Sequence, residues 1–453
     1  MPNDSGMAEI PRYRGRFGEK QAERLLWRAG FGPRPGEAKR LAKKGLNKAV
    51  ASLLDPPKAK FAGPAPVDGD GLPIAPYDLW GHDALWWLDK MVRSNQPLVE
   101  RMALNWHDWF ATGDVGSQRF SVGQAQLFRR RALGPFDKLL LDVTRDRAML
   151  VWLSGIDNNR WSPNENYARE LMELFTLGAS DASGYPYSED EVREQARALT
   201  GWRADWVDDV GLTNFRYDPG YHDAGTKTVF GKSGRFDWRD LCRLCLQHGA
   251  HAGYFVDRLW SYFVAGPAPA STRSKLIRLY RRKDYAVKPL LAAILKHPQL
   301  YEGPAMVKPP VVYIAGMLRA RRRGVDTDAW TWVSGLAGQR PFSPPNVAGW
   351  DEERWLDTSS YRGRWVAASQ ITREDEASDE SYDASETPAE AVDKALRYWG
   401  KPTVAAGTRD ELIRFGRGVE DAIVADWQEA TFRALRQNAL RMLLATSPDM
   451  QTC

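Results

Sequence analysis

The stretch SPNENYARELMELFTLG, residues 162–178, predicts a helix with well-marked ends. Ser162 fits the N-cap, Pro163 the first helical position and Glu165 the third, which is the pattern of a capping box with its preferred proline. Gly178 is typical of the residue that ends a helix. Because such segments recur along the chain, we expect a helical fold.

One face of this predicted helix is polar. At about 100° per residue, the face collects Glu165, Asn166, Arg169, Glu170 and Glu173. Glu170 and Glu173 are three residues apart, a spacing at which two carboxylates can bind one metal ion or share one proton. The plain alternative is a solvated face on which Arg169 pairs with Glu173, with Glu165 acting as a helix cap.

Helical periodicity continues from residue 77 to about 300, whereas alternating β patterns are rare, with 226–230 as one short candidate. The predicted fold is all-α, a multi-helix globular core with Pro/Gly-rich loops and little β structure. Four parts are expected along the chain. They are an N-terminal helical segment and loop over 1–76, a helical core over 77–372, an acidic disordered insert over 373–390, and a C-terminal helical unit over 391–453 that packs on the core.

The composition is that of an ordinary globular protein. The 453 residues are 43% hydrophobic and carry a net charge of +5, too small a surplus to imply a nucleic-acid or anionic-membrane partner. Three cysteines cannot form a disulfide framework. The basic triplets at 129–131, 281–283 and 321–323 favour solvated helix faces over a nucleic-acid groove. No stretch reaches the roughly 18 apolar residues of a membrane span.

The first twenty residues are polar and lack the apolar core of a secretory signal. The chain as given is therefore expected to be cytoplasmic, or exported if an N-terminal signal was removed.

His107 borders the apolar stripe of a helix predicted from Pro97 onward. A histidine in this place is either bonded to the backbone at the edge of the core or is a ligand or base that needs partners from another helix. The face of Glu170 and Glu173 is one source of such partners.

A polar loop over 221–231 contains His222, Asp223 and Lys227. Asp223 could orient His222, or the two could bind a metal, and the alternative is a turn closed by the Asp223 side chain. The loop lacks the spacing of a phosphate-binding P-loop. The helix before it begins with a second capping box, Ser188 to Glu191, and its Arg193 and Arg197 are placed to pair with carboxylates of the 162–178 helix.

Cys242, Cys245, His248 and His251 are spaced by threes, which suggests zinc ligands at first sight. On one continuous helix, however, steps of three residues drift by about 60° each, so four such ligands cannot converge. A plain helix is the favoured interpretation, and zinc would require a break near Gly249.

These motifs together resemble the bacterial family called "domain of unknown function 1800", and the resemblance covers most of the chain. The most specific stretch is 164–178. The other matching stretches are 23–32, 101–107, 131–134, 149–153, 196–202, 222–227, 338–350 and 447–449. The resemblance implies a mostly helical fold and no particular reaction. Many family members resemble exported proteins and have genes near those of a sulfatase-like partner. The acidic insert and the Cys pair depart from the family pattern.

The main functional hypothesis is a metal-dependent enzyme, hydrolytic or oxidative. Its metal ligands would be His107, Glu173 and His222, and iron, manganese or zinc would suit such a mixed set. Glu170, His222 and Asp223 are the candidate catalytic residues. Arg169 and Lys227 would bind an anionic substrate.

The alternative hypothesis is a non-catalytic interaction or scaffold protein in which the same polar residues form a buried structural ion-pair network. A carboxylate pair that cleaves polysaccharide is less favoured, because Glu170 and Glu173 lie on adjacent turns of one helix and a sugar must fit between such groups.

Overall fold

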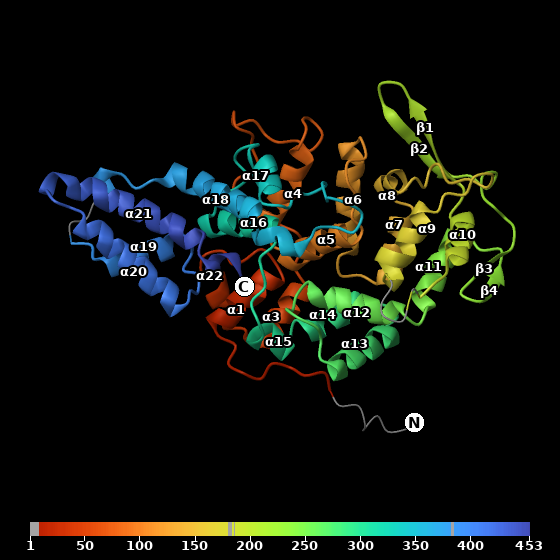
Figure 1. Cartoon of the computed structure of the whole chain (residues 1–453), viewed down its shortest axis with the longest axis horizontal. Coiled ribbons are helices and arrows are strands. Elements are labelled where there is room, and N and C mark those ends of the chain that lie inside the picture. The colour runs from red at the N-terminus through yellow and green to blue at the C-terminus, as the bar shows by residue number, and fades with distance from the viewer. Residues whose placement is uncertain (1–8, 180–183, 185, 382–384) are drawn as a thin grey trace. The chain divides into compact units, whose positions relative to one another are not determined.

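A computed structural model describes residues 9–179, 184, 186–381 and 385–453 (Figure 1). This part of the chain is 56% helical, with 22 helices, and only 7% is strand, in two small two-stranded sheets. The prediction of an all-α fold with little β structure is confirmed. Within the described residues, every helix is too short or too polar to span a bilayer.

The chain divides into two compact units. The first comprises Met102–His297, Phe342–Trp350 and the N-terminal segment up to Arg12. Its helices after α5 (Pro97–Trp109), whose end it contains, are α6 (Gln118–Arg131), α7 (Phe136–Thr144), α8 (Arg147–Trp152), α9 (Asn166–Glu170), the π-helix η1 (Leu171–Leu177), α10 (Glu189–Ala198), α11 (Trp238–Gln247), α12 (His251–Ser261), α13 (Ala270–Arg282) and α14 (Val287–Ile294). Its strands form two antiparallel hairpins, β1 (Trp202–Val207) with β2 (Gly211–Tyr217), and β3 (Lys227–Val229) with β4 (Lys232–Gly234).

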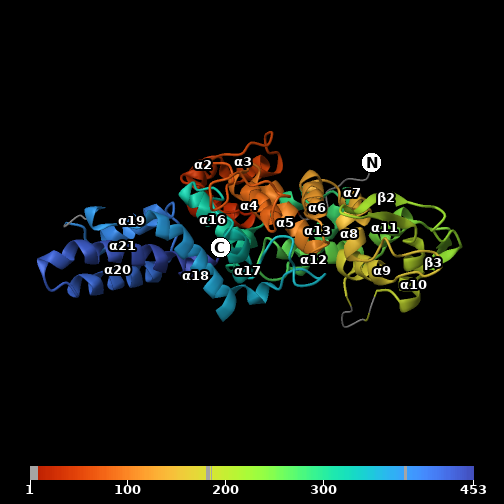
Figure 2. The same ribbon diagram turned by 90° about the horizontal axis from the view of Figure 1, so that it is seen from above.

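The second unit comprises Tyr13–Arg101, Pro298–Pro341 and Asp351–Cys453. Its helices are α1 (Glu19–Arg28), α2 (Glu37–Ala42), α3 (Gly45–Leu54), α4 (His82–Arg93), α15 (Pro298–Glu302), α16 (Pro310–Arg321), α17 (Trp330–Leu336), the 3-10 helix η2 (Glu352–Leu356), α18 (Thr358–Thr372), the 3-10 helices η3 (Arg373–Asp375) and η4 (Asp379–Ser381), α19 (Pro388–Tyr398), α20 (Ala406–Asp421), the 3-10 helix η5 (Asp426–Gln428), α21 (Glu429–Ala445) and α22 (Pro448–Gln451). Figure 2 shows α19, α20 and α21 side by side.

An aromatic cluster forms the core of the first unit. Trp106, Trp109 and Phe110 of α5 are completely buried. Phe136 of α7 and Phe255 of α12 pack against them, with ring centroids 4.6 Å apart from one another. Burial of such large rings removes a large apolar area from water, which stabilises the unit.

In the second unit, α16 is buried on nearly all sides and carries a buried cation, Arg319. Its guanidinium pairs with Glu37 at 3.2 Å and donates to the carbonyl oxygens of Gly32 and Val92. These partners satisfy a charge that would otherwise destabilise the core.

Residues 373–390 were predicted as a disordered acidic insert, and 382–384 lie outside the described residues. In the rest of the segment, Asp375 pairs with Arg321 at 2.8 Å and Glu386 pairs with Arg436 at 2.9 Å. A capping box of Thr387 and Glu390 opens α19. The four-part division of the chain stays a prediction.

Candidate functional site

The predicted helix over 162–178 has a different form in the structure. The prediction of a capping box at Ser162 and Glu165 is wrong, because α9 begins only at Asn166 and its N-cap, Glu165, makes no side-chain capping bond. From Leu171 to Leu177 the chain is a π-helix rather than an α-helix. π-Helical turns are rare in proteins, and those that occur are often found at functional sites. This segment is therefore the first candidate for a functional site. The second capping box, Ser188 with Glu191, is confirmed.

Side chains of α5 and α12 satisfy the carbonyl oxygens at the end of this π-helix. Tyr254 Oη and Arg258 Nη1 donate to Leu174 O, both at 2.6 Å, Trp109 Nε1 donates to Phe175 O at 3.1 Å, and His251 Nδ1 lies 2.9 Å from Thr176 O. The last carbonyls of a helix have no partner within the helix, so external donors of this kind stabilise its end. Neutral His251, whose pKa burial lowers to about 4, donates from the nitrogen that faces the carbonyl.

Arg258 links the π-helix to Asp108. The guanidinium lies 4.7 Å from the Trp109 ring centroid and donates to the Asp108 carbonyl at 3.3 Å. The Asp108 carboxylate accepts from Tyr262 Oη at 2.6 Å. Burial raises the pKa of Tyr254, Arg258 lowers it, and the charges of Glu173 and Asp108 raise it further. Asp108, Glu173, Tyr254 and Arg258 therefore act on one another, and with Glu170 we call them the π-helix cluster.

The carboxyl of Glu170 has a raised pKa. Burial and then the charge of Glu173 raise its pKa from 4.5 to about 7, although Arg169 lowers it. The carboxyl of Glu170 makes no hydrogen bond to any described residue, whereas the carboxylate of Glu173 accepts from Tyr187 Oη at 3.3 Å. The structure thus brings together the two predicted carboxylates, and one of them can exchange a proton near neutral pH.

Arg169, predicted to hold substrate, is committed to other carboxylates. It makes a two-pronged ion pair with Glu189 of α10, at 2.8 and 2.9 Å, and a longer one with Glu165 at 3.4 Å. The alternative pairing of Arg169 with Glu173 is wrong. Arg193 of α10 pairs with Glu165 at 3.6 Å, which confirms the prediction for this arginine. For Arg197 the prediction is wrong, because Arg197 pairs with Glu194 and Asp223 instead.

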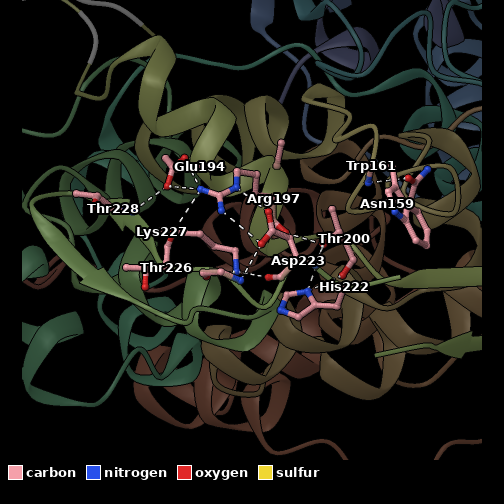
Figure 3. Close-up of polar contacts among 12 residues, drawn as sticks. Asn159, Trp161, Glu194, Arg197, Thr200, His222, Asp223, Thr226, Lys227 and Thr228 are labelled. Atoms are coloured by element: carbon pink, nitrogen blue, oxygen red, sulfur yellow. Dashed lines mark hydrogen bonds and ion pairs between the residues drawn. The ribbon is translucent and has the colours of Figure 1, made fainter. Parts of the chain in front are cut away.

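His222 and Asp223 lie in the loop before β3, and Lys227 is the first residue of that strand (Figure 3). They lie beside Arg197 in the last turn of α10 and Thr200 just after it. We call these five residues the His222 network. Asp223 accepts from Arg197 Nε at 2.7 Å, and its backbone N–H donates to Thr200 Oγ1 at 2.8 Å. Burial raises the pKa of Asp223, but hydrogen bonds from Arg197 and from the Gly225 N–H outweigh burial and lower it.

Lys227 is completely buried and donates to the carbonyl oxygens of Asp223 and Gly225. His222 Nδ1 lies 3.0 Å from the Thr200 carbonyl, and burial lowers its pKa. The donors and acceptors of the network thus bond to one another and hold the loop against the end of α10. This arrangement matches the turn interpretation of the loop more closely than a site that holds an anionic substrate.

His107 lies in an aromatic pocket of the first unit. Its ring is completely buried among Phe128, Phe342 and Trp350, and Nε2 accepts from the Phe342 N–H at 3.0 Å. Burial lowers the pKa of His107 to about 3, so the ring is neutral. The neighbouring Asp108 accepts from the Trp350 N–H at 2.9 Å. His107 and Asp108 therefore anchor both ends of the Phe342–Trp350 segment to α5.

The predicted metal set does not form. In the described ranges, no group of three or more His, Cys, Asp or Glu side chains could hold a metal ion. His107 faces aromatic rings, Glu173 faces Tyr187, and His222 faces Thr200, so metal binding by these three is not supported.

The Cys/His run also forms no such group. The chain does break between α11 and α12, since His248 caps α11 and His251 opens α12. Cys242 contacts Thr144 Oγ1 at 3.3 Å, and burial raises the pKa of both Cys242 and Cys245 to about 12. Protonated buried thiols are structural rather than reactive.

Sequence reasoning missed Asp108, Tyr254 and Arg258 of the π-helix cluster. Tyr254 and Arg258 are four residues apart on α12, so they share a face, which is the only signal of their joint role. Nothing in the sequence distinguishes a π-helix from an α-helix at 171–177.

The protein is thus predominantly helical, and its two candidate polar sites are the π-helix cluster and the His222 network. The family model described as "Protein of unknown function (DUF1800)" matches residues 24–452. Because the match spans nearly the whole chain, the protein belongs to the DUF1800 family, and the resemblance is confirmed. No curated protein matches the chain, and no solved structure does.

Proposed function

We propose that the protein is an enzyme in which Glu170 of the π-helix cluster transfers a proton. The observation that carries this proposal is a half-buried carboxyl with a pKa of about 7 beside a second carboxylate, Glu173, on a π-helix. A group with this pKa is present in both protonation states near neutral pH, so it can act as general acid or general base. Such a group suits hydrolysis, one of the two chemistries expected from the sequence.

The supporting geometry is the rigid attachment of the π-helix. Tyr254 and Arg258 hold the Leu174 carbonyl from α12, one turn away from Glu170 along the chain. A catalytic group is most effective where its backbone is held in place before substrate binds. The metal-dependent version of the hypothesis has weaker support, because His107 is enclosed by aromatic rings and its Nε2 already accepts a hydrogen bond.

The test is a screen of the purified protein against chromogenic esters, phosphate monoesters and glycosides. On a substrate that is turned over, Glu170→Gln is expected to lower kcat by about 10²–10⁴-fold and to remove a limb of the pH profile near pH 7. Glu165→Gln is the matched control, since Glu165 is partly exposed and pairs with Arg169. Turnover by Glu170→Gln with the pH profile of the wild type would contradict the proposal.

The second candidate is the non-catalytic scaffold, and the observation that favours it is the His222 network. Arg197, Asp223 and Lys227 are all engaged with one another or with backbone carbonyls. If this network serves folding, a double-mutant cycle of Arg197→Ala and Asp223→Ala should show a coupling of about 1 kcal/mol in the free energy of unfolding.

The matched control for that cycle is the exposed pair of Arg169 and Glu189, for which a smaller coupling is expected. Equal coupling in the two pairs would remove the special structural role of the His222 network. Proton transfer by Glu170 and a structural His222 network are compatible with each other, so each has its own test.

A further inference from the structure

A second feature of the first unit lies on helices that the proposed function does not use. α13, α14 and the N-terminal segment at residues 9–12 enclose a cavity of about 370 Å³. Figure 1 shows α13 and α14 as neighbouring green helices. A cavity of this size lies within the range of small-molecule sites.

Five cationic side chains line this cavity, and Glu9 is the one acidic residue among the described residues of its wall. The cations are Arg12, Lys275, Arg278, Arg282 and Lys296. Glu9 is already occupied, because its carboxylate pairs with Arg12 at 2.8 Å and its carbonyl accepts from Lys275 Nζ at 3.2 Å. The charge around the cavity is therefore strongly positive.

Three of the cations have no partner of their own. The side chains of Arg278, Arg282 and Lys296 make no ion pair or hydrogen bond to any residue in the described part of the chain, so within that part their charges are left to solvent or to a ligand. Burial lowers the pKa of Lys296, and the like charge of Arg12 lowers it further. Cations gathered around a cavity repel one another unless an anion lies between them.

The rest of the wall is apolar. Leu279 of α13 faces Pro289, Ala292 and Ala293 of α14, and Ile10 and Pro11 complete the lining. An inorganic anion would pair with the cations and leave this apolar surface exposed to water. A ligand with an anionic head and an apolar body would use both.

We propose that this cavity binds an organic phosphate, with the phosphate held by Arg278, Arg282 and Lys296 and the organic group against Leu279 and α14. Arginine suits this role because its planar guanidinium can give two parallel hydrogen bonds to phosphate oxygens. The site is independent of Glu170 and can be tested without knowledge of the reaction.

The experiment measures binding of phenyl phosphate, inorganic phosphate and phenol to the full chain by calorimetry and ³¹P line broadening. Phenyl phosphate is expected to bind most tightly, inorganic phosphate more weakly and phenol not measurably. The double variant Arg278→Gln/Lys296→Gln should weaken phenyl phosphate binding by about tenfold or more, since each charge-assisted hydrogen bond is worth about 1.5–3 kcal/mol.

Lys283→Gln is the matched control, because Lys283 follows α13, is exposed and lies outside the cavity wall. This variant should bind like the wild type, and melting curves of all variants show whether the fold is kept. If Lys283→Gln and the double variant lose the same affinity for phenyl phosphate, the attraction is non-specific and the proposal is overturned. The proposal is also overturned if the protein binds neither phosphate probe and no vesicles.

The phosphate could belong to a soluble compound or to a lipid headgroup, and a vesicle arm distinguishes these sources. Co-sedimentation with phosphatidic acid vesicles but not phosphatidylcholine vesicles, lost in Arg278→Gln/Lys296→Gln, would assign the phosphate to a lipid. Binding of phenyl phosphate without vesicle binding would assign it to a soluble ligand. Both outcomes support phosphate recognition by this cavity.

Discussion

Arg258 Nη1 of α12 donates a hydrogen bond of 2.6 Å to the carbonyl oxygen of Leu174 inside the π-helix. Tyr254 Oη donates to the same oxygen at 2.6 Å. One carbonyl near the end of the π-helix thus accepts two side-chain donors from another helix, α12. The segment that follows Glu170 and carries Glu173 is therefore attached to α12.

Replacing Arg258 should destabilise the first unit. Arg258→Met keeps the aliphatic stem but removes the donor to Leu174 and the charge beside Asp108. We expect a loss of about 1.5–3 kcal/mol in the free energy of unfolding by urea, because the Leu174 carbonyl keeps only the Tyr254 donor and Asp108 loses the positive charge beside it. Arg243→Met, at an exposed ion pair on α11, is the control and should change stability by less than about 0.5 kcal/mol. Similar losses in both variants would deny Arg258 this role.

The raised pKa of Glu170 predicts a pH dependence of stability. The folded pKa is about 7 and the ordinary value is 4.5, so between these pH values the folded state binds more protons than the unfolded state. The contribution of Glu170 to the free energy of unfolding is therefore fully present below pH 4.5 and is lost as the pH rises through 7. Because the group is only half buried, the loss should be about 1–2 kcal/mol.

The measurement is the difference in unfolding free energy between the wild type and Glu170→Gln at several pH values from 4.5 to 8. The variant should gain relative to the wild type as the pH rises. A difference that does not vary with pH would show that Glu170 titrates at an ordinary value, and the proposed proton transfer would lose its basis.

The lowered pKa of His107 predicts that stability changes with pH in the opposite direction. Its folded pKa of about 3 lies below the ordinary 6.5, so the unfolded state binds the extra proton between these values and stability falls as pH drops through this window. The loss is on the order of 4 kcal/mol for a completely buried ring. His107→Gln keeps a hydrogen-bond acceptor for the Phe342 N–H and should show a smaller loss between pH 6.5 and 4. Ring ¹⁵N shifts of a protonated imidazole at pH 5 in the folded protein would refute this expectation.

Gly349 should not tolerate a side chain. Its φ is +98°, and a Cβ would lie 2.7 Å from the Asp108 carbonyl oxygen. Gly349→Ala is expected to lower the free energy of unfolding by about 2–3 kcal/mol. The causes are backbone strain and loss of the hydrogen bond from the Trp350 N–H to Asp108. Gly123→Ala, within α6 and with nothing near a Cβ, should instead stabilise by about 0.5–1 kcal/mol in the same thermal melts. Equal tolerance at both positions would contradict the close packing of Gly349 on Asp108.

Local patterns predicted much of the fold. The helical class, the capping box at Ser188 and the short strand at 227–229 all follow from interactions within a few residues, so the sequence encodes them directly. The pairing of Glu170 with Glu173 is also local, since both lie within one turn of the chain. The Arg193 pairing with Glu165 followed from adjacent helices in the same way.

The remaining features depend on partners that are far away in the chain. The π-helix accepts hydrogen bonds from Tyr254 and Arg258, which lie 80 and 84 residues beyond Leu174, and no periodicity within 171–177 reveals these partners. The neutral state of His107 likewise depends on Phe342, 235 residues away. Hydrogen bonds and burial across such distances arise only when the helices pack, so the amino-acid order defines the helices and their faces, and packing sets which polar groups meet and how they ionise.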